Sequence, residues 1–202
     1  MHSRRAMMLV AAVPVLWVAL SGWSAAAALN NLFAAAINSI TEDELYQHVE
    51  VLADDVYEGR SAGSRGGRAA ALYVLDQIKP HRMTPGNNGD YAQTFNNNCR
   101  NILILLPGDD PRVENEVIVV GAHYDHVGRG KNSNSFGPTG RIHNGADDNA
   151  SGTSVLLETI EAFATSGLKT RRTILFAFWD AEEMALSARG TGLPIRRCRS
   201  NE

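Results

Sequence analysis

The sequence Gly145-Ala-Asp-Asp-Asn-Ala-Ser-Gly152 lies directly before a segment with helical periodicity. It is the central one of three polar motifs in the chain. Two adjacent carboxylates, Asp147 and Asp148, stand between glycines that allow a tight backbone. Paired acids before a helix often act only as an N-cap and as favourable charges at the helix dipole. A carboxylate also has two oxygens, so it can bridge a pair of divalent cations. The stretch therefore predicts either a helix cap or a metal-binding loop.

Two further polar motifs follow or close short apolar runs on either side of this stretch. Gly121-Ala-His-Tyr-Asp-His126 follows the β-branched run 116–121, and Trp179-Asp-Ala-Glu-Glu183 follows the apolar run 173–178. With the helical pattern of residues 151–164 between them, the two runs predict an α/β fold with a parallel, right-handed strand–helix–strand unit of buried strands. Sites in such sheets lie beyond the carboxyl ends of the strands. We therefore expect the three motifs to meet at one edge of the sheet.

The first motif pairs a histidine with a carboxylate. Asp125 stands two residues after His123 and can accept a hydrogen bond from the second imidazole nitrogen, which would fix the tautomer and raise the basicity of His123 as a ligand. A lone histidine after a strand is more often structural, so both interpretations stay open at this point. His126 has no such partner and is interpreted as an ordinary loop residue.

The third motif places two acids at the end of a strand. Glu182 and Glu183 would repel each other and lose hydration there unless a positive charge lies between them. A metal ion would relieve one acid and leave the other as a general base for a metal-bound water, whose pKa zinc lowers towards ~7. A structural α/β domain with coincidental acids is the least favoured interpretation, because nothing would offset the desolvation.

Together, His123-Tyr-Asp125, Gly145 to Gly152 and Ala181-Glu-Glu183 resemble the signature of the exported di-zinc aminopeptidases. This is metallopeptidase family M28 of clan MH, which holds leucyl-type aminopeptidases and relatives of glutamate carboxypeptidase and the transferrin receptor. The likeness extends from about Leu45 to Met184, including the lead-in Leu52-Ala-Asp-Asp-Val-Tyr-Glu-Gly-Arg60. It implies a three-layer α/β/α zinc-exopeptidase-like sheet, of which this chain would hold only the amino-terminal part.

The resemblance also implies a role for each residue that matches the signature. His123 would bind one zinc ion with Asp125 as its hydrogen-bonding partner, Asp148 would bridge two zinc ions, and Glu183 would bind the second. Glu182 would act as the general base that deprotonates a metal-bound water for attack on a peptide carbonyl, and would pass the proton to the leaving amine. The implied cofactor is Zn²⁺, two ions in the intact family, and the implied substrate is a peptide with a free N-terminus.

The sequence departs from the family after the third motif. The family has a further aspartate ligand and a further histidine ligand downstream, whereas no Asp or His follows Glu183 here. Each of two zinc ions would keep two protein ligands, where a catalytic zinc ion normally has three. We therefore expect a truncated, inactive form with weak or no zinc binding and an exposed apolar sheet edge. The alternatives are a non-catalytic fragment or binding module, or a single-zinc relative such as a glutaminyl cyclase.

The amino terminus has the features of an export signal. Arg4 and Arg5 precede an apolar run over residues 7–20, and the small residues 25–27 form a cleavage site. This pattern predicts that the protein is exported to the periplasm or the extracellular space, with no stable membrane span after cleavage. The expected organisation is a signal peptide at 1–27, a mostly helical region at 28–98, a partial α/β metallopeptidase domain at 99–187 and an aberrant tail at 188–202. The tail has four arginines and no apolar periodicity, and a frameshift near Ala188 is the hypothesis for it.

Composition sets broad limits on the function. The 202 residues are 44% hydrophobic and 20% charged, which fits one globular domain with extensions. The net charge of −3 without a basic stripe gives no indication of nucleic-acid binding. Cys99 and Cys198 are far apart, so free thiols are expected rather than a disulfide framework. Local patterns predict a helix capped by Thr41 and Glu44, a second helix over 69–78, and strands over 91–95 and 101–106.

Overall fold

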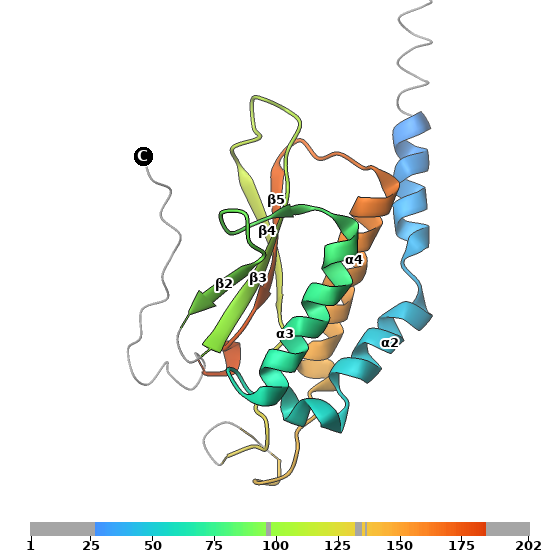
Figure 1. Cartoon of the computed structure of the whole chain (residues 1–202). Coiled ribbons are helices and arrows are strands. Elements are labelled where there is room, and N and C mark those ends of the chain that lie inside the picture. Colours follow the sequence, from blue (N-terminus) through green and yellow to red (C-terminus); the bar gives the residue numbers. More distant parts are fainter. Residues whose placement is uncertain (1–26, 96–97, 132–134, 136, 185–202) are drawn as a thin grey trace, which may run out of the picture.

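The computed structural model describes residues 27–95, 98–131, 135 and 137–184. A mixed five-stranded sheet has the order β1-β3-β5-β4, with β2 paired to β3, and the described helices pack against one of its faces (Figure 1). Residues 27–39 are helical. The other helices are α2 (Glu42–Leu52), α3 (Arg65–Ile78) and α4 (Gly152–Ser166), with 3-10 turns η1 (Asp55–Arg60) and η2 (Lys79–His81) and an irregular turn η4 (Ala146–Ser151). The strands are β1 (Thr84–Pro85), β2 (Ala92–Phe95), β3 (Cys99–Leu106), β4 (Val117–His123) and β5 (Thr173–Trp179).

The predicted strand–helix–strand unit is confirmed. β4 and β5 are parallel neighbours with Val117 opposite Thr173 and His123 opposite Trp179, while α4 connects η4 to the segment before β5. The other strand pairs are antiparallel. Because β4 and β5 run in register in the same direction, their carboxyl ends lie side by side. The residues that follow them therefore emerge at one edge of the sheet, as the sequence predicts.

The amino-terminal helices begin where their caps require. The Glu44 N–H donates to Thr41 Oγ1 at 3.2 Å and the Thr41 hydroxyl donates to the Glu44 carboxylate at 2.6 Å, so the predicted cap of α2 is confirmed. α3 begins four residues before the predicted start at residue 69, because the Gly67 N–H donates to the Ser64 hydroxyl at 3.1 Å and caps the helix there.

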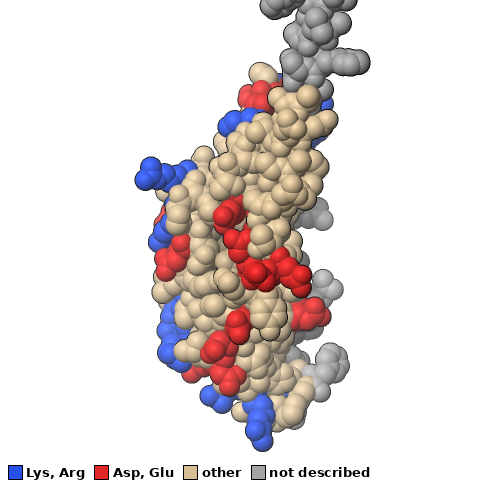
Figure 2. Space-filling model, turned by 90° about the vertical axis from the view of Figure 1, so that its right-hand side faces the viewer, with Lys and Arg blue, Asp and Glu red and all other residues tan. Residues whose placement is uncertain are grey.

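One hydrophobic core joins the helices to the sheet. Fully buried residues from helices, such as Leu52 and Val74, belong to the same cluster as Ile104 and Phe176 from the sheet. Figure 2 shows the helical side of the molecule, where Asp and Glu side chains gather. The first turn of α2 is acidic, which favours its N-terminal dipole.

Strand β4 differs from its prediction. The β-branched run predicts a buried strand, yet the side chains of Val117, Ile118, Val119 and Val120 are 53%, 46%, 55% and 39% exposed. The prediction of burial is wrong for the described chain, because β4 pairs with β5 on one side and no described strand pairs with its outer edge. The expected exposed apolar edge is thereby confirmed.

Several expectations concern residues that lie outside the described ranges. The signal peptide falls on them except for residue 27, and the tail at 188–202, with Cys198, falls on them entirely. Cys99 is a buried free thiol, whose pKa burial raises to about 11. In the described part of the chain, no helix is long and apolar enough to cross a membrane.

Candidate metal centre

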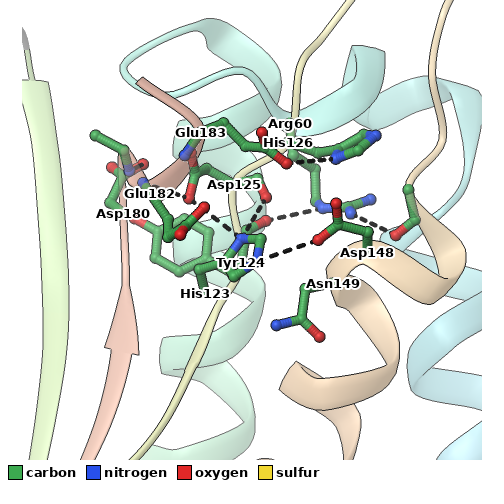
Figure 3. Close-up of polar contacts among 12 residues, drawn as sticks. Arg60, His123, Tyr124, Asp125, His126, Asp148, Asn149, Asp180, Glu182 and Glu183 are labelled. Atoms are coloured by element: carbon green, nitrogen blue, oxygen red, sulfur yellow. Dashed lines mark hydrogen bonds and ion pairs between the residues drawn. The ribbon is translucent and has the colours of Figure 1, made fainter. Parts of the chain in front are cut away.

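The three polar motifs meet at the carboxyl ends of β4 and β5 (Figure 3). His123 is the last residue of β4, Glu182 and Glu183 follow β5 after one tight turn, and Asp148 lies in η4 directly before α4. Asp125 lies among them and is fully buried. All five predicted site residues are therefore brought into one region.

Three of these residues form a group that could hold a metal ion. One ligand atom each from His123, Asp148 and Glu183 lies within 4.8 Å of the other two. His123 Nε2 is 3.2 Å from Asp148 Oδ1. Two donors at the usual zinc distances in a tetrahedral site lie about 3.3 Å apart, so this pair fits zinc. A histidine nitrogen with two carboxylates is also a donor set that zinc takes in catalytic sites.

Asp125 supports the centre in a different way from the one predicted. The His123 Nδ1–H donates to the backbone carbonyl of Asp125 at 3.2 Å, whereas the nearest carboxylate oxygen of Asp125 is 3.7 Å away. This hydrogen bond places the proton on Nδ1 and leaves Nε2 for a ligand. The carboxylate instead accepts the backbone N–H groups of Glu182 at 3.1 Å and Glu183 at 3.3 Å. Asp125 thus fastens the third motif to the first.

Burial and neighbouring charges raise the pKa values of two ligands in the centre. Burial raises the pKa of Glu183 to about 7, with further contributions from the negative charges of Asp148 and Asp125. Burial lowers the pKa of His123, but the hydrogen bonding and charge of Asp125 outweigh this effect and raise the pKa to about 9. The crowded acids contribute to both raised pKa values, and a bound cation would relieve their repulsion.

The two interpretations of the paired acids are separated by the contacts of η4. Neither Asp147 nor Asp148 caps α4 through its side chain. The Gly152 N–H instead donates to the Asn149 side-chain oxygen at 3.0 Å. Asn149 therefore holds the start of the helix, which leaves Asp148 to face His123 while Asp147 accepts the Ser151 hydroxyl through its backbone carbonyl.

Gly145 is required by two features of this turn. Its φ of +57° lies in the left-handed region that disfavours side chains. A Cβ there would also overlap the Asp148 carbonyl oxygen and lie 2.6 Å from the His126 ring.

Two residues of the site were missed by the sequence analysis. His126 Nδ1 lies 3.2 Å from Glu183 Oε1, so the interpretation of His126 as an ordinary loop residue is wrong. The sequence feature that could have indicated a role for His126 is its position three residues after His123 in the same motif. Arg60 is fully buried beneath the centre and donates to the carbonyl oxygens of Tyr124 and Gly145 at 2.8 Å. The sequence gives little indication of this role, because every residue has a backbone carbonyl oxygen and no residue type identifies the acceptors.

The family model described as Peptidase family M28 matches residues 101–190. Leupeptin-inactivating enzyme 1 of Streptomyces exfoliatus is 30% identical over 130 residues, which cover 63% of this chain and 25% of that protein. Leucine aminopeptidase 1 of Grosmannia clavigera is 30% identical over 159 residues, covering 73% of this chain and 35% of that protein. The chain thus spans 25% to 35% of the length of these two relatives.

Solved structures agree on the fold. LapB from Legionella pneumophila superposes with a TM-score of 0.55 at 24% identity, over 81% of this chain and 43% of LapB. The LapA aminopeptidase from the same organism gives 0.53 at 19% identity, over 83% of this chain and 44% of LapA. The predicted zinc-exopeptidase-like α/β fold, present in part, is confirmed by these likenesses. Residues 101–190, which carry β4, β5, most of β3 and the candidate metal centre, match peptidase family M28, a family of metallopeptidases.

Proposed function

We propose that this chain carries a zinc centre of the aminopeptidase type, whose chemistry is the removal of N-terminal residues from peptides. The observation that carries the proposal is the convergence of His123, Asp148 and Glu183, with one ligand atom of each within 4.8 Å of the others. The sequence-based assignment divided these ligands between two ions. We propose instead that they hold a single ion, because three protein donors and a water complete a catalytic zinc site.

The residues around the ion have separate tasks in this proposal. Zinc would activate a water and polarise the scissile carbonyl. The ring of His123 is oriented by its Nδ1–H bond to the Asp125 carbonyl. Glu182 is the general base that accepts the proton of the attacking water and delivers it to the leaving amine. Because the Asp125 carboxylate holds the backbone N–H groups of both glutamates, it keeps this base in a fixed position relative to the ligand Glu183.

The sequence alone predicts an inactive chain with weak or no zinc binding, whereas the convergence of three ligands leads us to propose zinc binding with slow turnover. In the described part of the chain, the candidate site is open to solvent on the side of Asp148. Asp148 is itself 63% exposed. An open site excludes water poorly and offers few walls that orient a peptide.

The proposal is tested by titrating the purified chain with Zn²⁺ and measuring hydrolysis of a leucyl anilide. We expect one zinc ion per chain, slow zinc-dependent hydrolysis, and loss of that hydrolysis in Glu182→Gln with zinc binding unchanged. Folded protein that binds no zinc would overturn the proposal. A zinc-bound chain whose hydrolysis does not change in Glu182→Gln would overturn the role of the base. An N-terminal glutaminyl peptide in the same assay detects the cyclase alternative, and zinc binding without either reaction identifies a non-catalytic module.

Export is part of the same proposal. It is supported by the basic Arg4 and Arg5, the apolar run and the small residues at 25–27. Expression in a bacterial host should yield protein in the periplasm that begins near residue 28, as mass spectrometry of the intact chain would reveal. Cytoplasmic protein that retains residues 1–27 would contradict it.

A further inference from the structure

Arg60 is a buried cation beneath the metal centre, with no exposed side-chain surface. Its guanidinium donates four hydrogen bonds, all to backbone carbonyl oxygens. The acceptors are Tyr124 at 2.8 Å, Leu52 at 2.6 Å, Asn144 at 2.6 Å and Gly145 at 2.8 Å. Four of its five N–H groups are therefore used, in the fixed fork geometry that a guanidinium imposes.

These four carbonyls belong to three separate segments, two of which carry metal ligands. Tyr124 stands between His123 and Asp125, and Gly145 stands three residues before Asp148. The third segment ends α2 at Leu52. One planar side chain thus ties the end of β4 to the start of η4, and anchors both to the helical layer (Figure 3).

The backbone around Arg60 has an unusual conformation that directs this side chain toward the four carbonyl oxygens. Glu58, Gly59 and Arg60 have φ values of 52°, 69° and 48°, which are unfavourable for the two residues that have side chains. The segment is fixed by two bonds to the chain that follows β4: the His126 N–H donates to the Arg60 carbonyl at 3.2 Å, and the Gly128 N–H donates to the Gly59 carbonyl at 2.9 Å. Strained conformations of this kind persist only where the surroundings hold them.

We propose that Arg60 is a positioning residue of the metal centre, whose guanidinium holds the Asn144–Gly145 segment against Tyr124 and thereby sets the distance between Asp148 and His123. The inference rests on the proposed function, since it takes zinc as the ion. It goes beyond that function because Arg60 touches neither the ligand side chains nor the reacting groups through a described hydrogen bond.

The charge of Arg60 stabilises the nearby acids in the metal-free chain. Burial lowers the pKa of its guanidinium to about 10, against the opposing effect of Asp125 and Asp148, so the group remains cationic at neutral pH. A fixed positive charge beneath the acids reduces their mutual repulsion and supports a compact ligand set.

The test compares the zinc affinity of Arg60→Gln and Arg60→Lys with that of the unmodified 202-residue chain, by competition with a chromophoric chelator. We expect Arg60→Gln to weaken zinc binding about 10- to 100-fold, the range found when residues supporting metal ligands are removed. Arg60→Lys should recover part of this loss, because an ammonium group can still donate to some of the four carbonyl oxygens. The absorption spectrum of the Co²⁺-loaded variants should also change, since the ligand geometry changes.

Two control variants separate positioning from stability. Arg68→Gln removes a guanidinium that donates to the Gly63 carbonyl at 2.7 Å, outside the ligand segments. Val74→Ala creates a cavity at a fully buried core position and lowers the Tm. Both should retain the zinc affinity of the unmodified chain. A folded Arg60→Gln variant that binds zinc within about twofold of the unmodified chain would overturn the inference, as would a Val74→Ala variant that loses as much affinity.

Amide hydrogen exchange gives a readout that does not depend on zinc. Arg60→Gln should exchange about tenfold faster or more at residues 144–148, because charged hydrogen bonds that close this segment are lost, while Val74→Ala should not do so selectively. If the unmodified chain binds no zinc, the proposed function fails and this exchange experiment still decides the inference. Unchanged exchange at residues 144–148 would overturn the role of Arg60.

Discussion

Among the clusters of histidine with carboxylate in the described part of the chain, two use these groups in opposite ways. The metal centre contains His123, Asp148 and Glu183 at the carboxyl ends of the strands. A second cluster, which we call the helix cluster, joins His48 of α2, Tyr73 of α3 and Glu158 of α4.

The difference lies in how many ligand groups surround each imidazole and in access to solvent. In the helix cluster, His48 Nε2 lies 3.0 Å from the Glu158 carboxylate and Nδ1 lies 2.6 Å from the Tyr73 hydroxyl, so both nitrogens are occupied. The Glu158 side chain is only 3% exposed, whereas Asp148 is 63% exposed. In the metal centre, His123 Nε2 lies 3.2 Å from Asp148 Oδ1, and Glu183 adds a second carboxylate, so an ion would find three donors within 4.8 Å of one another. The same residue types thus serve helix packing in one place and ligand binding in the other.

The largest effect is expected from removing the central ligand of the metal centre. His123→Ala should weaken zinc binding about 100-fold or more, since a catalytic zinc site with three protein ligands loses one of them. The matched variant His48→Ala should leave zinc affinity unchanged, because His48 belongs to no group of three metal ligands in the described part of the chain. Isothermal titration of both variants checks this. Equal losses of affinity in the two variants would break the distinction between the clusters.

The pH dependence of zinc binding gives the next largest effect. Protons compete with zinc for His123, whose pKa is raised to about 9, and for Glu183, whose pKa is raised to about 7. Apparent zinc affinity should therefore rise with pH, by up to about tenfold per pH unit between 7 and 9 and more steeply below 7, where two protons are displaced. Titrations between pH 6 and 9 measure the slope, and a flat profile would contradict the assignment of these two ligands.

The helix cluster should respond through stability instead. His48→Ala leaves the buried Glu158 carboxylate and the Tyr73 hydroxyl without their partner, which should lower the free energy of unfolding by about 1–3 kcal/mol. Chemical denaturation at neutral pH measures this change. His123→Ala serves as the control, and it should lower stability less, because its neighbour Asp148 remains hydrated.

The smallest effect concerns the acid of the helix cluster. Burial raises the pKa of Glu158 above its ordinary value of 4.5, and the hydrogen bond from His48 only partly opposes this. An acid whose pKa is raised in the folded state loses stability as pH rises from its unfolded pKa through its folded pKa. Glu158→Gln should remove this pH-dependent loss. Unfolding curves at pH 4 and pH 7 should show the variant gaining stability relative to the unmodified chain at the higher pH; a difference independent of pH would contradict the burial effect.

Sequence patterns were sufficient to predict the strands and the helix that carry the site. The apolar runs before His123 and before the glutamates indicated strands, and polar residues at strand ends indicated a site because parallel strands end together. Hydrogen bonds between residues close in sequence cap both α2 and α3. The cap of α2 by Thr41 is predicted from the sequence, whereas the cap of α3 by Ser64 is not.

Contacts between distant segments were harder to predict. Arg60 binds carbonyl oxygens up to 85 positions away, and every residue supplies such an acceptor, so no residue type revealed the contact. The partner of His126 is 57 positions away in the third motif. The exposure of β4 could not be predicted from its own residues, because burial of a strand depends on which strands lie beside it.

The most direct test of the metal centre is a crystal structure of zinc-soaked protein with anomalous data collected at the zinc absorption edge. We predict an anomalous peak at ligand distance from His123 Nε2, Asp148 and Glu183, and none beside His48 and Glu158. A peak in the helix cluster, or the absence of a peak among the three ligands, would contradict the central claim that these strand ends form a zinc site.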